Sequence, residues 1–152
     1  MMGRLLAREP WAAPLVDAYL RPRARIEAGL LLAAESLATA AIDISDGWGG
    51  DLLHLCRKSG VRARVRLSDF PRAVLLPAAT ALGVDPSDWQ LGPSDDYELL
   101  FTTAPSQIDR VREFASFGLE AVLVGCIEEG PAEVRIDDDL VHEARAHVRQ
   151  VA

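Results

Sequence analysis

The sequence predicts an α/β (α+β) sandwich, in which a mixed sheet is covered by helices with partly ferredoxin-like connections. Short apolar runs typical of strands alternate with amphipathic runs typical of helices, and glycine or proline separates most of them. The content of 49% hydrophobic and 26% charged residues is that of a folded protein. With 152 residues and neither a repeat nor a low-complexity linker, the chain is expected to form a single domain over residues 1–152.

The first elements expected are two helices and a buried strand. Residues 10–20 repeat apolar side chains at helical spacing, and Pro10 suits a first helical turn. Pro22 interrupts this pattern, and a second helix is expected over residues 24–34. Residues 39–44 are apolar and bounded by turn signals, which favours a buried strand.

A third helix is expected over residues 47–59, with Gly60 able to end it. Residues 61–67 alternate strictly between apolar side chains and arginines, which predicts a half-exposed strand with an arginine face. A short helix over residues 75–82 and a loop over residues 83–86 should follow. The apolar stripe of the third helix consists of Trp48, Leu52, Leu55 and Cys56.

The C-terminal part predicts three strands and one further helix, followed by a polar tail that is helical or frayed. The order of elements gives two β-α-β units and a trailing hairpin. The strands are expected at residues 97–103, 121–127 and 132–136, the helix at 105–117 and the tail at 141–150.

Composition excludes several classes of function. A net charge of −7 argues against broad nucleic-acid binding, which needs a basic surface. Lys58 is the only lysine, so basic contacts to a ligand should come from arginine. Cys56 and Cys126 form no CxxC pair, which makes a zinc site improbable, and both are expected to be buried thiols in a reducing compartment. No stretch is long and apolar enough to span a bilayer, and we expect a cytoplasmic protein.

The turn at residues 43–47 is the strongest candidate for a site. If Ile42 and Ile44 point into the core, alternation places Asp43 and Ser45 on the other face, with Asp46 at the entry of the next helix. Carboxylate oxygens at such a turn suit Mg²⁺ and the phosphates it accompanies. Asp51, one turn further on, could join this acidic rim. The alternative is a simple helix cap followed by a solvated strand end.

A second acidic segment, Ser94-Asp95-Asp96-Tyr97-Glu98, precedes the third strand. Its two consecutive aspartates could bind a second metal ion or accept hydrogen bonds from a substrate. On an extended strand, Asp96 and Glu98 would share one face. A solvated loop with an exposed strand face is the competing interpretation.

These two acidic segments resemble, in order and separation, those of thiamine-monophosphate kinases. The resemblance rests on Ala41–Gly47 and Asp96–Phe101, and extends to Ala81–Pro86 and Val124–Ile127. It implies the C-terminal domain of an enzyme in the aminoimidazole ribonucleotide synthetase and selenophosphate synthetase superfamily. By the same resemblance, Mg²⁺ would be held by Asp43 and Asp46, ATP would be contacted by Ser45 and Gly47, and the thiamine phosphate would be bound by Asp95 and Asp96.

The sequence also departs from the family pattern. Pro93 to Asp96 replace the family's Gly-Gly-Glu-Asp, which shortens the substrate carboxylate at Asp95 and stiffens its loop. The usual aromatic C-terminal signature has no counterpart in residues 141–152. The N-terminal domain, which in the family supplies further metal ligands and the dimer interface, is expected to be absent, so this chain alone should be inactive or nearly so.

Three hypotheses therefore stay open at the level of sequence. The first is the C-terminal domain of a thiamine-monophosphate kinase, which would be completed by an N-terminal domain in cis or in trans and could form a homodimer. The second is a relative that phosphorylates a different acceptor. The third is a nucleotide-binding or interaction module that kept the fold and lost the chemistry.

Overall fold

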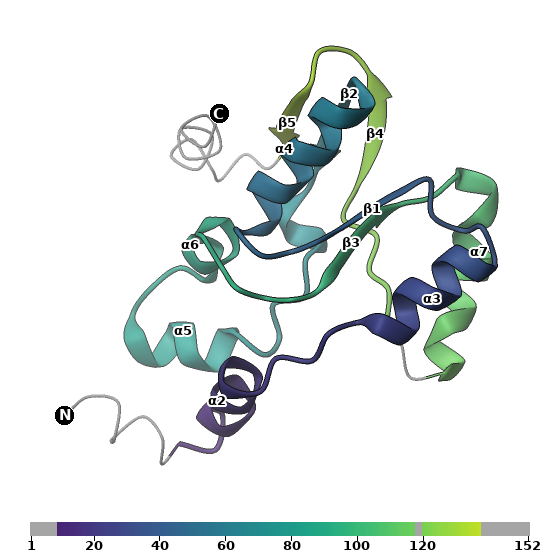
Figure 1. The fold of residues 1–152 in the computed structure, drawn as a ribbon. Coiled ribbons are helices and arrows are strands. Elements are labelled where there is room, and N and C mark those ends of the chain that lie inside the picture. Colours follow the sequence, from purple (N-terminus) through teal and green to yellow (C-terminus); the bar gives the residue numbers. More distant parts are fainter. Residues whose placement is uncertain (1–8, 118–119, 138–152) are drawn as a thin grey trace.

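The computed structural model describes residues 9–117 and 120–137, so the tail predicted at residues 141–150 lies outside the described residues. The elements form two sheets with helices around them (Figure 1). The helices are α2 (Ala12–Leu20), α3 (Ile26–Ala34), α4 (Trp48–Ser59), α5 (Leu76–Leu82), α6 (Pro86–Leu91) and α7 (Ile108–Arg112). The strands are β1 (Ala40–Asp43), β2 (Val61–Val65), β3 (Leu99–Thr102), β4 (Gly125–Glu129) and β5 (Glu133–Ile136).

The predicted mixed α/β class is confirmed, but the strands pair differently from the expected β-α-β units. β1 pairs with β3 in an antiparallel ribbon, and a separate sheet has the order β4-β2-β5. β2 is antiparallel to β4 and parallel to β5. The trailing hairpin is therefore wrong, because β2 lies between β4 and β5, and residues 130–132 cross its end.

The β1–β3 ribbon separates two hydrophobic clusters. Figure 1 shows it crossing the middle of the molecule, with α4 and the three-stranded sheet on one side and α3 and α7 on the other. Side chains alternate along β3, so Leu100 packs on the α4 side while Leu99 and Phe101 pack on the α3 and α7 side. The predicted α4 stripe of Trp48, Leu52, Leu55 and Cys56 is buried, and Gly60 ends the helix at a φ of 66°.

Helix α6 was not expected, because residues 83–86 read as a loop. Its sequence signal was nevertheless present: the Asp85 side chain caps the helix by accepting a hydrogen bond from the Ser87 N–H at 2.8 Å, and Pro86 occupies the first turn. The same hydrogen bond lowers the pKa of the Asp85 carboxyl.

Several elements differ from their predicted bounds, most clearly β2, β3, β4 and the helix predicted at residues 105–117. β2 ends at Val65 rather than at residue 67, because a 3₁₀ segment begins at Leu67. β4 begins at Gly125 rather than at residue 121, because β2 ends at Val65 and leaves the preceding residues no strand to pair with. β3 begins at Leu99 rather than at residue 97, after a residue with positive φ. The helix predicted at residues 105–117 consists of α7 between two 3₁₀ segments, Pro105–Gln107 and Glu113–Phe117.

The arginine face of β2 is neutralised by acidic neighbours. Arg64 contacts Glu128 at 2.9 Å and Asp137 at 2.5 Å, and these hydrogen bonds raise the pKa of its guanidinium. Arg62 forms an ion pair with Glu133 at 2.6 Å. These arginines stabilise the sheet and do not form a free basic surface for a polyanion.

The two cysteines have opposite environments. Cys56 is fully buried in α4, and burial raises the pKa of its thiol. Cys126 is exposed on β4, so the prediction that both thiols are buried is wrong for this one. It lies on the open face of a strand at the edge of its sheet. Across residues 9–117 and 120–137, no helix is long and apolar enough to cross a membrane.

Candidate functional site

The first acidic turn follows β1 directly, and its side chains alternate as predicted. Ile44 packs against the α4 cluster, whereas Asp43 and Asp46 are exposed and Ser45 is half-buried. Among the described residues, the carboxylates of Asp43 and Asp46 have no hydrogen-bond or ion-pair partner. Both therefore present free hard oxygen donors at the end of the strand.

Asp51 does not join this acidic rim. Its side chain is only 2% exposed, and its Oδ2 accepts hydrogen bonds from the backbone N–H of Ser45 at 2.9 Å and of Asp46 at 3.1 Å. The carboxylate turns inward because two backbone donors and the N-terminal end of α4 stabilise its charge there. It belongs to the structure of the turn rather than to its exposed surface.

The second acidic segment lies beside the first. The Tyr97 N–H donates to the Ile44 carbonyl and the Ile44 N–H donates to the Glu98 carbonyl, both at 2.9 Å. These bonds continue the β1–β3 pairing beyond the strand ends. The structure therefore brings together the two segments that the sequence separates by about fifty residues.

Gly47 joins the two segments at a second point. It is buried, with a φ of 105°, and a Cβ built there would lie 2.9 Å from the Gly92 carbonyl oxygen and 3.3 Å from Pro93 Cα. Only glycine permits both this backbone conformation and this close approach. The loop that leads to Asp95 therefore packs directly against the start of α4.

Within the second segment, the two predicted substrate residues differ in their contacts. Asp95 is exposed and its carboxylate has no hydrogen-bond or ion-pair partner among the described residues, whereas the Asp96 Oδ2 accepts a hydrogen bond from Ser94 Oγ at 2.8 Å. Tyr97 has a φ of 52°, an unusual conformation for a bulky residue. The expectation that Asp96 and Glu98 share a strand face is therefore wrong, because the extended strand begins only after them.

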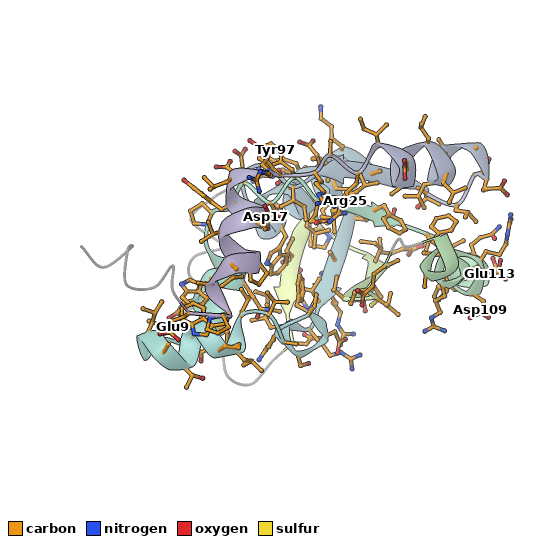
Figure 2. The ribbon with its side chains drawn as sticks, turned by 90° about the horizontal axis from the view of Figure 1, so that it is seen from below. Glu9, Asp17, Arg25, Tyr97, Asp109 and Glu113 are labelled. Carbon is orange, nitrogen blue, oxygen red and sulfur yellow. The ribbon has the colours of Figure 1, made fainter. Side chains whose placement is uncertain are left out.

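Glu98 is instead part of an ion pair that the sequence did not suggest. Its Oε2 accepts from Arg25 Nε at 2.8 Å, and its Oε1 accepts from the same guanidinium. This bidentate contact joins the start of α3 to the start of β3, and the hydrogen bond to Glu98 raises the Arg25 pKa. Figure 2 shows Arg25 in the segment between α2 and α3, near the middle of the molecule.

A contact between Trp48 of α4 and Gln90 of α6 also helps to position the loop at residues 92–96. The Trp48 indole N–H donates to the Gln90 carbonyl, and its ring packs against Phe70 with centroids 4.7 Å apart. Gln90 lies in α6, immediately before the second acidic segment. Helix α6 and its contact with α4 thus help to position the residues that lead into the second acidic segment.

A cavity of about 290 Å³ lies between α3, β3 and residues 120–121. Leu99 lines this cavity and is the register partner of Asp43 on β1, so the cavity lies on the same face of the ribbon as Asp43. Both apolar and charged side chains line it, among them Arg25, Leu32, Glu98, Phe101, Phe114 and Glu120.

The carboxylates of Asp43 and Asp46 suit a cation that keeps water or phosphate oxygens among its ligands. Among the described residues, no group of three or more histidine, cysteine, aspartate or glutamate side chains could hold a metal ion. Asp43 and Asp46 can supply carboxylate oxygens, which Mg²⁺ prefers, and Mg²⁺ commonly completes its shell with water and phosphate oxygens. The turn is therefore chemically suited to a metal–nucleotide complex and not to a closed all-protein metal site.

Comparison with known families gives one extended match. Residues 3–138 match the model of the AIR synthase related protein, C-terminal domain. This range includes both acidic segments and every helix and strand described above.

Several thiamine-monophosphate kinases are similar to this chain. The chain is 32% identical over 123 residues to that of Aquifex aeolicus and 35% identical over 125 residues to that of Escherichia coli K12. These matches cover 80% and 79% of this chain but only 37% and 35% of the two relatives. The chain thus spans little more than a third of their length.

Solved structures give the same result. The thiamine-monophosphate kinase of Stenotrophomonas maltophilia K279a matches with a TM-score of 0.71 at 36% identity, over 80% of this chain and 37% of that one. The structure of AaThiL complexed with AMPPCP and TMP also matches with a TM-score of 0.71, at 31% identity, over 88% of this chain and 40% of that one. The predicted family resemblance and fold class are confirmed.

Proposed function

The chain belongs to the AIR synthase related protein C-terminal domain family, and from this premise we propose that it is the C-terminal part of a thiamine-monophosphate kinase. The reaction would transfer the γ-phosphoryl group of ATP to thiamine monophosphate and yield thiamine diphosphate. The observation that carries the proposal is the contact between the two acidic segments, one suited to a metal–nucleotide and one to an acceptor. The similarity to a structure complexed with AMPPCP and TMP supports it.

We assign the metal and nucleotide contacts to the first turn. Asp43 and Asp46 would hold Mg²⁺, whose charge offsets that of the phosphates during transfer. Ser45 would contact ATP through its hydroxyl group, because its backbone N–H is already bonded to Asp51. Gly47 would contact ATP through its backbone. Phosphoryl transfer of this kind depends on positioning and charge stabilisation rather than on a covalent enzyme intermediate.

Asp95 and Asp96 are assigned to the phosphate acceptor. Asp95 is exposed beside the metal-binding turn, so its carboxylate is available to a substrate. Asp96 is partly committed to Ser94 and would act by shaping the loop as well as by contact. Thiamine monophosphate carries a positively charged ring, which an acidic segment attracts.

Catalysis should require an N-terminal half, in cis or in trans. Two carboxylates supply only part of a magnesium shell, and transfer needs several phosphate charges neutralised at once. We therefore expect little or no turnover from this chain alone. A site for Mg-ATP fits a cytoplasmic protein. We also propose that the complete protein forms a homodimer through its N-terminal half.

Calorimetric titration with Mg-ATP tests the nucleotide assignment on this chain. We expect weak binding that Asp43→Asn and Asp46→Asn each reduce by about tenfold or more, since each removes a charged metal ligand. Glu129→Gln is the matched control, because it removes an exposed carboxylate on the other sheet and should leave binding unchanged. Equal binding by the native chain and both aspartate variants would contradict the assignment.

A different phosphate acceptor is the second candidate, and Asp95 is the observation that favours it. The shorter carboxylate stands where the related family usually has glutamate, within a loop stiffened by Pro93. A panel of phosphate acceptors offered to the chain together with its completing half would decide. Preference for thiamine monophosphate would remove this candidate, while absence of turnover with any acceptor would support a non-catalytic binding module.

A further inference from the structure

Asp51 occupies a position at which a helix would otherwise attract an external anion. It lies in the first turn of α4, where backbone N–H groups and the helix dipole favour negative charge. Its carboxylate is buried, and one oxygen accepts the N–H groups of both Ser45 and Asp46. A phosphate group approaching these two donors would meet a carboxylate already bound to them.

The same two bonds fix the turn that carries the candidate metal ligands. The peptide groups of Ser45 and Asp46 are directed toward Asp51, while the side chains of Asp43 and Asp46 stay exposed. The Asp51 N–H also donates to the Gly47 carbonyl at 3.1 Å, which begins α4 at this turn. Asp51 therefore contacts the backbone on which the metal ligands are mounted.

We propose that Asp51 is a positioning residue that makes this turn selective for a divalent cation over a bare phosphate. The proposal rests on the metal site assigned above and deepens it. Asp51 occupies the N–H groups of Ser45 and Asp46 just before the helix and holds the turn that carries the exposed carboxylates, so a phosphate group reaches this part of the turn only through a bound metal ion. Groups that orient metal ligands in this way typically change metal affinity by roughly 10–100-fold when altered.

The consequence for nucleotide recognition is specific. In a phosphate-binding loop, backbone N–H groups at a helix start receive the phosphate directly. Here, the two N–H groups nearest the acidic side chains are bonded to a buried residue of the same helix. Metal-free ATP should therefore find neither of these two N–H groups available, and the divalent ion should carry the contact at Ser45 and Asp46.

Amide NMR spectra of the full chain test this proposal, with ATP in excess EDTA, Mg-ATP and Mn²⁺ alone as probes. In the native chain, we expect Mg-ATP to shift the amides of residues 43–47, Mn²⁺ to broaden them, and metal-free ATP to leave them unchanged. Asp51→Asn removes the charge but keeps the shape. Because the asparagine oxygen is a weaker acceptor for the same two N–H groups, this variant should raise the apparent Kd for Mn²⁺ by about tenfold or more.

Two further variants separate positioning from general destabilisation. Asp51→Ala removes both hydrogen bonds, so it should speed amide exchange at Ser45 and Asp46 by about tenfold or more in the absence of metal and allow metal-free ATP to shift these two amides. Leu55→Ala removes a buried side chain from the same helix and should lower the free energy of unfolding without changing the response to any of the three probes. Faster exchange confined to Ser45 and Asp46 supports a local role for Asp51.

The outcomes distinguish this inference from the proposed function. If the native chain responds to Mn²⁺ and Mg-ATP, but Asp51→Asn gives the same Kd for Mn²⁺ and Asp51→Ala gives no response to metal-free ATP, the role of Asp51 is overturned and the metal site stands. If Asp51→Ala leaves exchange at Ser45 and Asp46 unchanged, the positioning argument also fails. If the native turn responds to no metal probe, both the metal site and the selectivity inferred for Asp51 are overturned.

Discussion

Gly47→Ala should separate the two acidic segments, because glycine is required there for two independent reasons. The φ of 105° is rarely adopted by residues with a side chain, at a cost of about 1–3 kcal/mol. The added Cβ would also lie 2.9 Å from the Gly92 carbonyl oxygen and 3.3 Å from Pro93 Cα, which forces backbone to move at a further cost of about 1–3 kcal/mol. Together, these terms predict a loss of at least about 2 kcal/mol in the free energy of unfolding.

Differential scanning calorimetry measures this loss, and a fall in Tm of at least about 4 °C is expected for a chain of this size. Gly29→Ala is the matched control, because Gly29 lies inside α3 and nothing stands within 4 Å of its added Cβ. Alanine there should raise stability by about 0.5–1 kcal/mol through its better helix propensity. Equal Tm values for the Gly47→Ala variant and the native chain would refute the argument that Gly47 is held against the neighbouring loop.

Two other predictions concern the stability of the second sheet and the α4 core. Gly125→Ala should disrupt the β2–β4 pairing, since the added Cβ would lie 2.1 Å from the Arg64 carbonyl oxygen. Urea denaturation should show a loss of at least about 2 kcal/mol in the free energy of unfolding. A denaturation midpoint equal to that of the native chain would contradict this close approach. Burial raises the Cys56 pKa, so the thiol's contribution to stability is complete below its unfolded pKa, about 8.5, and is lost as pH rises through the folded pKa. The free energy of unfolding, measured from pH 7 to 10, should therefore decline above about pH 8.5. Cys56→Ala should diminish this decline, whereas Cys126→Ser should not. An identical pH profile for Cys56→Ala and the native chain would count against burial of Cys56 as the cause of the decline.

Local patterns allowed much of the fold to be predicted from the sequence. The alternation in β2 follows the two-residue period of a strand, and the apolar stripe of α4 follows the 3.6-residue period of a helix. The structure confirms both elements. Helix α6 has only six residues, too few to display a period, and only its Asp85-Pro86 start signalled it. Strand pairing could not be predicted, because partner choice depends on contacts between residues far apart in sequence.

The candidate site shows the same division. Exposure of Asp43 followed by alternation from the inward orientation of Ile44, whereas Asp46 was placed by its position at the entry of α4. The inward orientation of Asp51 could not be read from sequence, since acidic side chains are seldom buried without a partner and its partners are backbone groups. The roles of Asp43, Asp46, Ser45, Gly47, Asp95 and Asp96 in binding stay predictions.

The placement of α4 constrains how the length of this chain can vary among related sequences. The helix contacts β1 and β3 on one sheet and β2 and β5 on the other. One residue inserted in its middle would rotate everything beyond it by about 100°, so the side chains facing one of the sheets would point away from it. The turn at residues 130–132 has no such double role, so insertions and deletions should accumulate there and be excluded from α4.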